Sequence, residues 1–204
     1  MTVMPVQEKR AGVLDTPLGK DKLAIVRFDG SEGMNELFEW RLEAVSAEGD
    51  IDFDQLIGKH ATLTINGVNG RKRKFDGIVT EARWLGVRDH FHAYRLVLRP
   101  WLWVLSQRTD NYIFHEMSVT DIIADVFSDY GALAEFDDRT SAAYPPIEYC
   151  VQYRESDMAF VTRLMEEFGI SWSFVHADGS HKLVMSDQNM QVDTAEGATR
   201  KFIT

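Results

Sequence analysis

The sequence has little of what covalent or membrane-based stabilisation would need. Its 204 residues contain one cysteine, Cys150, so no disulfide can form within the chain. It has no run of about twenty apolar residues of the kind that spans a bilayer. Its N-terminus also lacks the basic region and apolar run of a secretory signal. These absences predict a protein made in the cytoplasm, with no signal peptide and no stable membrane anchor.

Positive charge is also scarce. The chain has 22 Lys and Arg against 32 Asp and Glu, a formal net charge of -10, which repels nucleic acid and anionic lipid. The one dense basic run, Arg71 to Lys74, has no interleaved aromatic residues on which bases could stack. It indicates a solvated edge strand or a charge patch that faces protein. We therefore expect protein partners and no nucleic acid.

The fold is predicted to be mainly β with an α+β portion. Apolar residues make up 45% of the chain, which suits one sizeable core or two small ones. Residues 1–20 show little periodicity and are predicted to be a flexible N-terminal arm. Residues 21–108 alternate in short strands and turns, which indicates a small antiparallel β-barrel-like domain. Its predicted strands are Leu23–Phe28, Leu37–Val45, Ala61–Ile65, Arg71–Thr80, Thr80–Leu85 and Phe91–Leu98, and the apolar run Trp101–Leu105 should lie in a packed sheet or under a covering element.

Residues 109–187 predict an α+β subdomain with two helices. Ser118 can cap a first helix that stops near Gly131, and residues 132–147 look loop-like. The stretch from Glu148 to His176 predicts a strand, a helix capped by Ser156, a glycine stop and a second strand, which continues through an Asp-Gly turn into a hairpin. Residues 188–204 form a polar tail, interpreted as the start of a downstream region.

Candidate metal sites in the first half of the chain are weak. Asp50, Asp52 and Asp54 alternate like the start of a calcium loop, but Gln55 stands where that loop needs glycine. We therefore expect Asp52 to cap a short helical turn instead. His90 and His92 are predicted to share one strand face, but no third ligand with suitable spacing is nearby.

Catalytic patterns are equally weak. His176 and His181 should face each other across the hairpin turn, close enough to share a metal or a proton. Glu155 and Asp157 flank Ser156, but a helix cap with charges near the helix end explains all three. No hydrolase, phosphate-binding or paired-cysteine motif is present. The sequence predicts no catalytic residue, no cofactor and no metal.

Several segments carry a family resemblance. The stretch from Tyr149 to Asp157 reads Y-C-V-Q-Y-R-E-S-D and is followed by Phe160, Arg163-Leu164-Met165-Glu166-Glu167 and Gly169. Together with the earlier segments it resembles the VgrG spike proteins of the type VI secretion system, over roughly residues 22–187. The earlier segments are Leu56-Ile57-Gly58-Lys59, Phe75-Asp76-Gly77-Ile78-Val79, Tyr94-Arg95-Leu96 and Leu98-Arg99-Pro100-Trp101-Leu102-Trp103 with Leu105.

The resemblance implies a structural role. Members of this family are trimeric, and their N-terminal region is similar to the hub of contractile phage tails, where small β-barrel-like domains adapt the Hcp tube to the spike. It also implies baseplate proteins, a PAAR tip protein and effectors as partners, the last two through regions beyond these residues. The implied localisation is cytoplasmic during assembly, followed by injection into a target cell.

Two alternative functions remain open. A contractile phage tail hub or baseplate protein would share much of the same signature. A small ligand- or glycan-binding β module is suggested by five tryptophans, although four of them fall on apolar strand faces, which favours core packing. Those four are Trp40, Trp101, Trp103 and Trp172, and the placement of Trp84 is less defined.

The predicted site is a signature that includes possible subunit contacts. Glu166 and Glu167 lie in the last turn of the second predicted helix, where the helix dipole disfavours carboxylates. Arg163 can offset part of this cost, and we expect Arg154 or a basic group of a neighbouring subunit to pair with them. The full set is Gln152, Tyr153, Arg154, Glu155, Ser156, Asp157, Arg163, Glu166 and Glu167.

Overall fold

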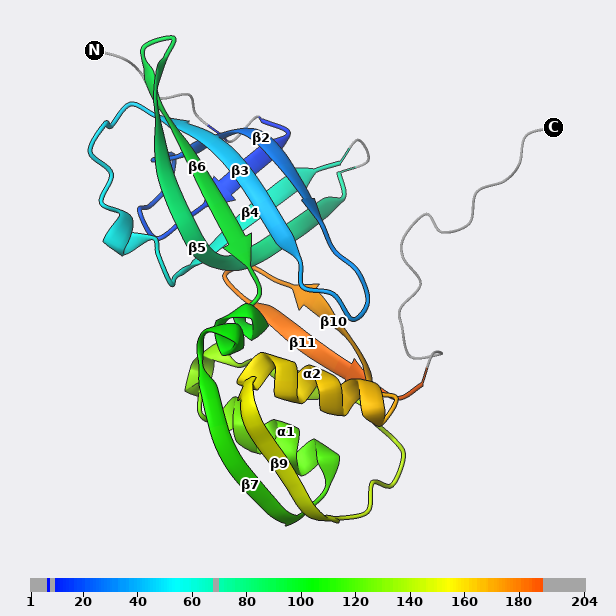
Figure 1. Cartoon of the computed structure of the whole chain (residues 1–204). Helices are drawn as coiled ribbons and strands as arrows, with labels where there is room; N and C mark the ends of the chain where they lie inside the picture. Colours follow the sequence, from blue (N-terminus) through cyan, green and yellow to red (C-terminus); the bar gives the residue numbers. More distant parts are fainter. Residues whose placement is uncertain (1–6, 8–9, 68–69, 189–204) are drawn as a thin grey trace, which may run out of the picture.

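The computed structural model describes residues 7, 10–67 and 70–188, which form two lobes stacked along one direction (Figure 1). Most of the expected polar tail lies outside the described residues. The first lobe is a six-stranded sheet in the order β1-β4-β5-β6-β3-β2, with every neighbouring pair antiparallel. Its strands are β1 (Gly12–Asp15), β2 (Ala24–Ser31), β3 (Glu39–Ser46), β4 (His60–Asn66), β5 (Lys72–Arg88) and β6 (Phe91–Arg99).

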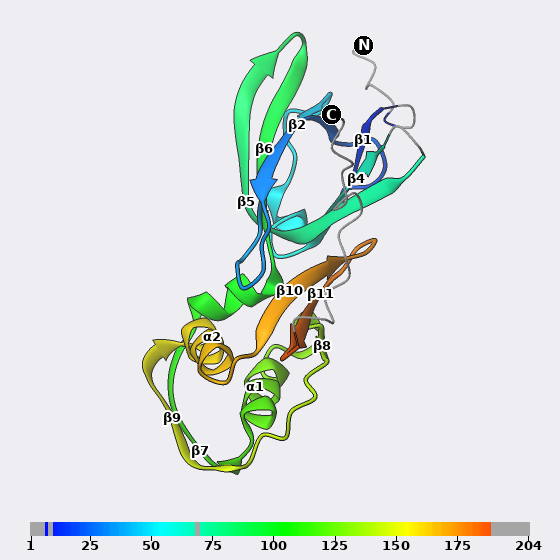
Figure 2. The ribbon, with the colours of Figure 1, turned by 90° about the vertical axis from the view of Figure 1, so that its right-hand side faces the viewer.

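This sheet curls until its two edge strands approach each other (Figure 2). The Arg10 guanidinium donates to the backbone carbonyl of Ile25 at 3.2 Å, which links the start of β1 to β2. Alternate residues point into the curl and are buried there, as the period of two requires. The predicted β-barrel-like domain is confirmed as a curled, incompletely closed sheet. Its interior is filled by Leu14, Phe38, Trp40, Leu42, Leu63, Tyr94, Leu96 and Leu98.

The second lobe packs two helices between two small sheets (Figure 2). One sheet is the antiparallel pair β7 (Thr109–Met117) and β9 (Ile147–Ser156). The other has the order β10-β11-β8, formed by β10 (Ser171–His176), β11 (His181–Ser186) and β8 (Phe136–Asp138), with β8 parallel to β11. The helices are α1 (Val119–Ser128) and α2 (Asp157–Glu167).

Both predicted helices are confirmed together with their caps. The Ser118 hydroxyl accepts from the backbone N–H of Asp121 at 3.2 Å, and the Ser156 hydroxyl accepts from that of Ala159 at 3.1 Å. Each cap satisfies one N–H that the first turn of a helix leaves unpaired. Gly169 follows α2 with a φ of 68°, the left-handed conformation expected of a glycine stop. The predicted cap at Asp52 is also present, on a short 3-10 helix (Phe53–Gln55).

The N-terminal arm differs from the expectation. Gly12–Asp15 forms β1 and pairs with β4, because the edge of the sheet offers unpaired backbone groups. The side chain of Gln7 is buried, accepts from the backbone N–H of Leu14 at 2.9 Å and donates to the Leu14 carbonyl at 3.3 Å. At least this part of residues 1–20 belongs to the curled sheet.

The basic run lies at a locally unpaired edge of the curled sheet. Lys72–Lys74 begins β5 and pairs with β4 on one side, whereas β5 pairs with β6 only from Ile78 onward. Lys72 and Arg73 are exposed, as expected of a solvated edge. Arg73 also pairs with Glu32 at 3.0 Å, and Lys74 pairs with Asp178 of the second lobe, so these two cations meet acidic groups of the same chain.

The apolar run after β6 lies under a covering element, which is one of its two expected placements. Trp101–Gln107 forms a 3-10 helix that begins after Pro100, connects the lobes and packs under α2, with Trp101, Leu102 and Leu105 buried. The β5–β6 hairpin turns at Asp89 and His90, both with positive φ, so His90 is a turn residue and does not share a strand face with His92.

Candidate functional site

The signature stretch joins β9 to α2 through a buried carboxylate. Asp157, in the first turn of α2, accepts from the Gln152 side-chain amide at 2.7 Å and from the Tyr130 hydroxyl at 2.6 Å. All three residues come from different elements, so the carboxylate holds the end of α1, the strand β9 and the start of α2 together. Burial and the nearby Asp157 raise the pKa of Tyr130, which keeps the phenol protonated as a donor.

Arg108 completes this arrangement from the connection between the lobes. Its guanidinium lies 2.6 Å from Asp129, 2.8 Å from Asp110 and 3.7 Å from Asp157. Hydrogen bonds to Asp129 and Asp110 raise the pKa of the Arg108 guanidinium. Sequence reasoning missed Arg108 and Tyr130, because neither lies within a motif or near Asp157 in the chain.

The charged residues of α2 pair partly as expected, since Arg163 lies within ion-pair distance of Glu167. Arg163 donates to Glu155 at 2.8 Å and lies 3.8 Å from Glu167. Arg154 instead lies over the Tyr153 ring, with 5.1 Å between its guanidinium carbon and the ring centroid. The expected pairing of Arg154 with Glu166 or Glu167 is wrong for this chain, since Arg154 has a φ of 53° at an irregularity of β9 that directs it elsewhere.

The outer face of the β7–β9 sheet is apolar and exposed. Tyr149, Val151 and Tyr153 are 61%, 46% and 63% exposed, whereas Cys150 and Gln152 between them face the helices. Ile113 of β7 lies opposite Val151 on the same face and is exposed as well. Of the signature residues on β9, Tyr153 and Arg154 therefore reach solvent, while Gln152 lies inside the fold with Asp157. The α2 residues Arg163, Glu166 and Glu167 are exposed as well.

A second polar cluster joins the two lobes around Asp76, which is completely buried on β5. Its carboxylate accepts from Nδ1 of His181 at 2.8 Å, from Nδ1 of His60 at 2.8 Å and from the Thr62 hydroxyl at 2.7 Å. Burial raises the pKa of Asp76, but hydrogen bonds from His181, His60 and Thr62 outweigh it, so the net pKa is lowered. The charge is thus held by donors from both lobes.

Further contacts extend the cluster across the same boundary. The two histidines of the hairpin, His176 and His181, stand opposite each other as predicted. Nε2 of His176 lies 3.0 Å from the carboxylate of Glu32 in the first lobe. The backbone N–H of Gly179 donates to the Thr62 hydroxyl at 2.9 Å. The tip of the β10–β11 hairpin is therefore fixed to the curled sheet.

One potential ligand atom from each of His60, Asp76 and His181 lies within 4.8 Å of the other two, so the cluster has to be tested as a metal site. Nε2 of His181 accepts from the backbone N–H of Trp101 at 2.8 Å. Nδ1 must then carry the proton that it donates to Asp76. A metal ion bound at Nδ1 would require the ring proton to sit on Nε2. That nitrogen could then no longer accept the hydrogen bond from the Trp101 N–H, and two donors would face each other. The residues therefore do not fit a metal ion and instead form a hydrogen-bonded link.

The tryptophans are mostly core residues. Trp40, Trp101 and Trp172 are buried, as expected, and Trp103 is half-buried under the Arg99 guanidinium. Trp84 is 50% exposed on the β5–β6 hairpin. Among the five tryptophans, Trp84 is therefore the one exposed enough to stack against a sugar ring.

A profile of the phage tail baseplate hub (GPD) matches residues 31–203. This chain belongs to the phage tail baseplate hub family. The hub chain is 41% identical over 181 residues to the type VI secretion system spike proteins VgrG1b and VgrG1c of Pseudomonas aeruginosa. The resemblance to VgrG spike proteins is confirmed. Each alignment covers 89% of this chain but only 24% and 25% of those proteins, so the hub chain spans about a quarter of their length.

A solved structure shows the same fold. The E. coli c3393 protein, described as a component of the type VI secretion system with structural similarity to the T4 phage tail proteins gp27 and gp5, superimposes with a TM-score of 0.75. The match covers 84% of the hub chain and 48% of c3393 at 20% identity. In the part of the chain that the structure describes, no helix is long and apolar enough to cross a membrane.

Proposed function

We propose that this chain is the hub portion of a type VI secretion spike, which in its full-length form assembles as a trimer and adapts the Hcp tube to the spike. The observation that supports it most strongly is the 41% identity to VgrG spike proteins across 89% of the chain. A baseplate hub must transmit force between rings without deforming. The buried links around Asp76 and Asp157 suit that role, because the first joins β4 and β5 to β11 across the two lobes and the second joins the end of α1, β9 and α2.

The exposed signature residues are the proposed subunit contacts. Tyr153 and Arg154 stand on the outer face of the β7–β9 sheet, beside Tyr149 and Val151. An apolar face with a cation at its rim has the composition of a protein interface. Gln152 and Asp157, in contrast, support this face from behind. Glu155, Ser156 and Arg163 shape the start and side of α2, and Glu166 and Glu167 stand at its end.

The hub chain is proposed to act without catalysis, cofactor or metal. The supporting observation is that the buried Asp76 carboxylate and both ring nitrogens of His181 are engaged in hydrogen bonds within the chain. Baseplate proteins, a PAAR tip protein and effectors are proposed partners of the extended protein. Assembly would take place in the cytoplasm and be followed by injection into a target cell.

The alternative is a hub of a contractile phage tail, which the name of the family itself supports. A secretion assay separates the two. We expect deletion of the gene in its host to abolish release of Hcp into the medium, and expression of the intact protein to restore it. Unchanged Hcp release, together with loss of contractile particles, would favour the phage tail hub.

A matched pair of variants tests the proposed contact face in the same assay. Tyr153→Asp places a charge on the outer face of β9, and Val175→Asp places one on β10, where Val175 is similarly exposed. We expect Hcp release to fall at least tenfold with Tyr153→Asp and to stay within twofold of the intact protein with Val175→Asp. Equal release by the two variants would contradict the assignment of this face.

A further inference from the structure

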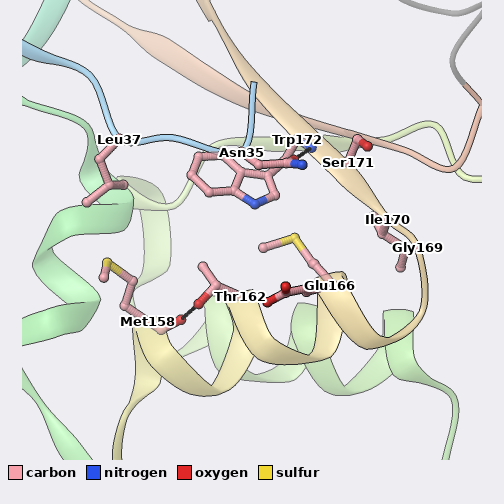
Figure 3. A pocket seen from close by; sticks show the side chains of 10 residues that line it. Asn35, Leu37, Met158, Thr162, Glu166, Gly169, Ile170, Ser171 and Trp172 are labelled. Carbon is pink, nitrogen blue, oxygen red and sulfur yellow. Dashed lines mark hydrogen bonds between the residues drawn. The ribbon is translucent and has the colours of Figure 1, made fainter. Parts of the chain in front are cut away.

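A cavity of about 500 Å³ opens between α2 and the segment that crosses above it (Figure 3). Its floor is the side of α2 that carries Met158, Thr162 and Glu166, and its roof is formed by Asn35 and the indole of Trp172. Leu37 closes one end, and Gly169 and Ile170 form the other. The volume falls within the usual range of ligand sites.

The roof of this cavity is held rigidly. The Asn35 side chain accepts from the backbone N–H of Trp172 at 2.8 Å, and the Asn35 backbone N–H donates to the Trp172 carbonyl at 2.9 Å. Asn35 has a φ of 58°, a left-handed conformation that asparagine tolerates better than most residues. In Figure 3 the indole nitrogen of Trp172 points toward α2 across the cavity. The aromatic ring is thus fixed in position before any ligand arrives.

The floor combines adaptable apolar groups with one charge. Met158 and Met165 present flexible thioether side chains, which adjust to the shape of an inserted group. The Thr162 hydroxyl donates to the carbonyl of Met158 at 2.7 Å, so its proton is already engaged. Glu166 is the one residue with a formal charge among those that line the cavity.

In the part of the chain that the structure describes, the Glu166 carboxylate has no ion-pair partner, although it lies at the C-terminal end of α2, where positive charge is favoured. Within residues 7, 10–67 and 70–188, no cation forms an ion pair with Glu166, whereas its neighbour Glu167 lies 3.8 Å from Arg163. The last turn of α2 contains no basic residue, although the carbonyl end of a helix favours positive charge. The carboxylate and the helix end therefore add their negative potentials at the same rim.

We infer that this cavity receives a lysine or arginine side chain of a partner protein. The aliphatic stem of such a side chain would pack between the methionines and Leu37, as these stems do on apolar surfaces. Its cationic head would meet the Glu166 carboxylate and the carbonyl end of α2. An acidic or purely apolar side chain would leave the carboxylate repelled or unpaired. The inference rests on the proposed function only in expecting the partner among the proteins of the assembly.

The test uses small probes with the intact chain. Nα-acetyl-lysine methylamide and Nα-acetyl-arginine methylamide are titrated against isotopically labelled protein, and Nα-acetyl-norleucine methylamide serves as the uncharged control with a similar stem. We expect saturable NMR shifts of the Trp172 indole N–H and the Gly169 amide with the two cationic probes, and at least tenfold weaker binding of the norleucine probe. The indole resonance is assigned with Trp172→Phe.

Two variants with the same change in net charge provide the comparison. Glu166→Gln should weaken binding of the cationic probes at least fivefold, while Glu167→Gln, one residue along the chain, should leave it within twofold. Equal binding by both variants, or absence of any saturable shift in the intact chain, would overturn the inference. If the probes bind only after residues 189–204 are removed, the cavity is occupied by the chain's own C-terminal segment and the partner proposal is wrong.

The outcome is independent of the test of the hub itself. A trimer of the extended protein with no probe binding would reject the cavity and keep the proposed function. Probe binding by a protein that stays monomeric when extended would reject the hub and show that this cavity takes cationic side chains in some other complex, which would contradict the expectation of an assembly partner.

Discussion

Removal of the Asp76 carboxylate should destabilise the chain more than any change at its surface. In Asp76→Ala, the buried Nδ1–H of His181 and the buried Thr62 hydroxyl both lose their acceptor. Each buried donor left unpaired costs about 1–3 kcal/mol. The sum for the two donors is about 2–6 kcal/mol. We expect the free energy of unfolding to fall by about 4 kcal/mol, a large part of the ~5–15 kcal/mol that holds a domain folded.

Urea denaturation followed by tryptophan fluorescence at pH 7.5 measures this loss. The matched control is Asp178→Ala, because the Asp178 side chain is 73% exposed and its ion pair with Lys74 also crosses between the lobes. That change should cost less than about 1 kcal/mol. Asp76→Asn, which keeps one acceptor oxygen, should fall between the two and remains measurable should the alanine variant not fold. A loss below 1 kcal/mol in Asp76→Ala, or equal losses in both alanine variants, would refute the reasoning.

Two further predictions concern pH and capping. Burial lowers the pKa of His181 more than Asp76 raises it, so the folded state keeps the ring neutral while the unfolded chain binds a proton below pH ~6.5. Stability from this group is present at pH 7.5 and is lost on acidification, by up to about 1.4 kcal/mol between pH 7.5 and 5.5. The pH dependence of unfolding should therefore be smaller by up to that amount in His181→Gln, and an unchanged dependence would argue against a neutral ring. Ser156→Ala should cost about 1 kcal/mol in urea unfolding through loss of the α2 cap, whereas Ser180→Ala, at a half-buried serine that caps no helix, should be near zero; equal effects would argue against the cap.

Local signals allowed much of the fold to be predicted. The caps at Ser118 and Ser156, the stop at Gly169 and the hairpin turns depend on residues within a few positions of one another. The position of His176 opposite His181 could be predicted for the same reason, because it follows from the length of the turn between β10 and β11. For such features, spacing and side-chain chemistry suffice.

Features that depend on tertiary packing could not be predicted in this way. Alternation in β9 predicts two different faces but not which one is buried, and hydrophobicity alone would have buried the tyrosines and left Gln152 outside. The structure does the reverse, because the Gln152 amide is needed at Asp157 beneath α2. The Asp76 cluster combines residues from β4, β5 and β11, separated by up to 121 positions between His60 and His181, and no local pattern marks it.

The basic run shows a third kind of limit. Its charges indicated a solvated edge strand or a charge patch that faces protein, but nothing in the sequence identified an ion-pair partner for any of them. The strand order placed Arg73 and Lys74 beside Glu32 and Asp178, which come from distant segments. Charge pairing across a sheet can be assigned only once the order of its strands is known.

The central claim is that this chain is the hub of a trimeric spike, and the most direct test is its mass in solution. Light scattering should be measured on this chain and on the protein extended past Thr204, at the same concentration and ionic strength. The account predicts three times the monomer mass for the extended protein. A monomer mass for both would contradict it.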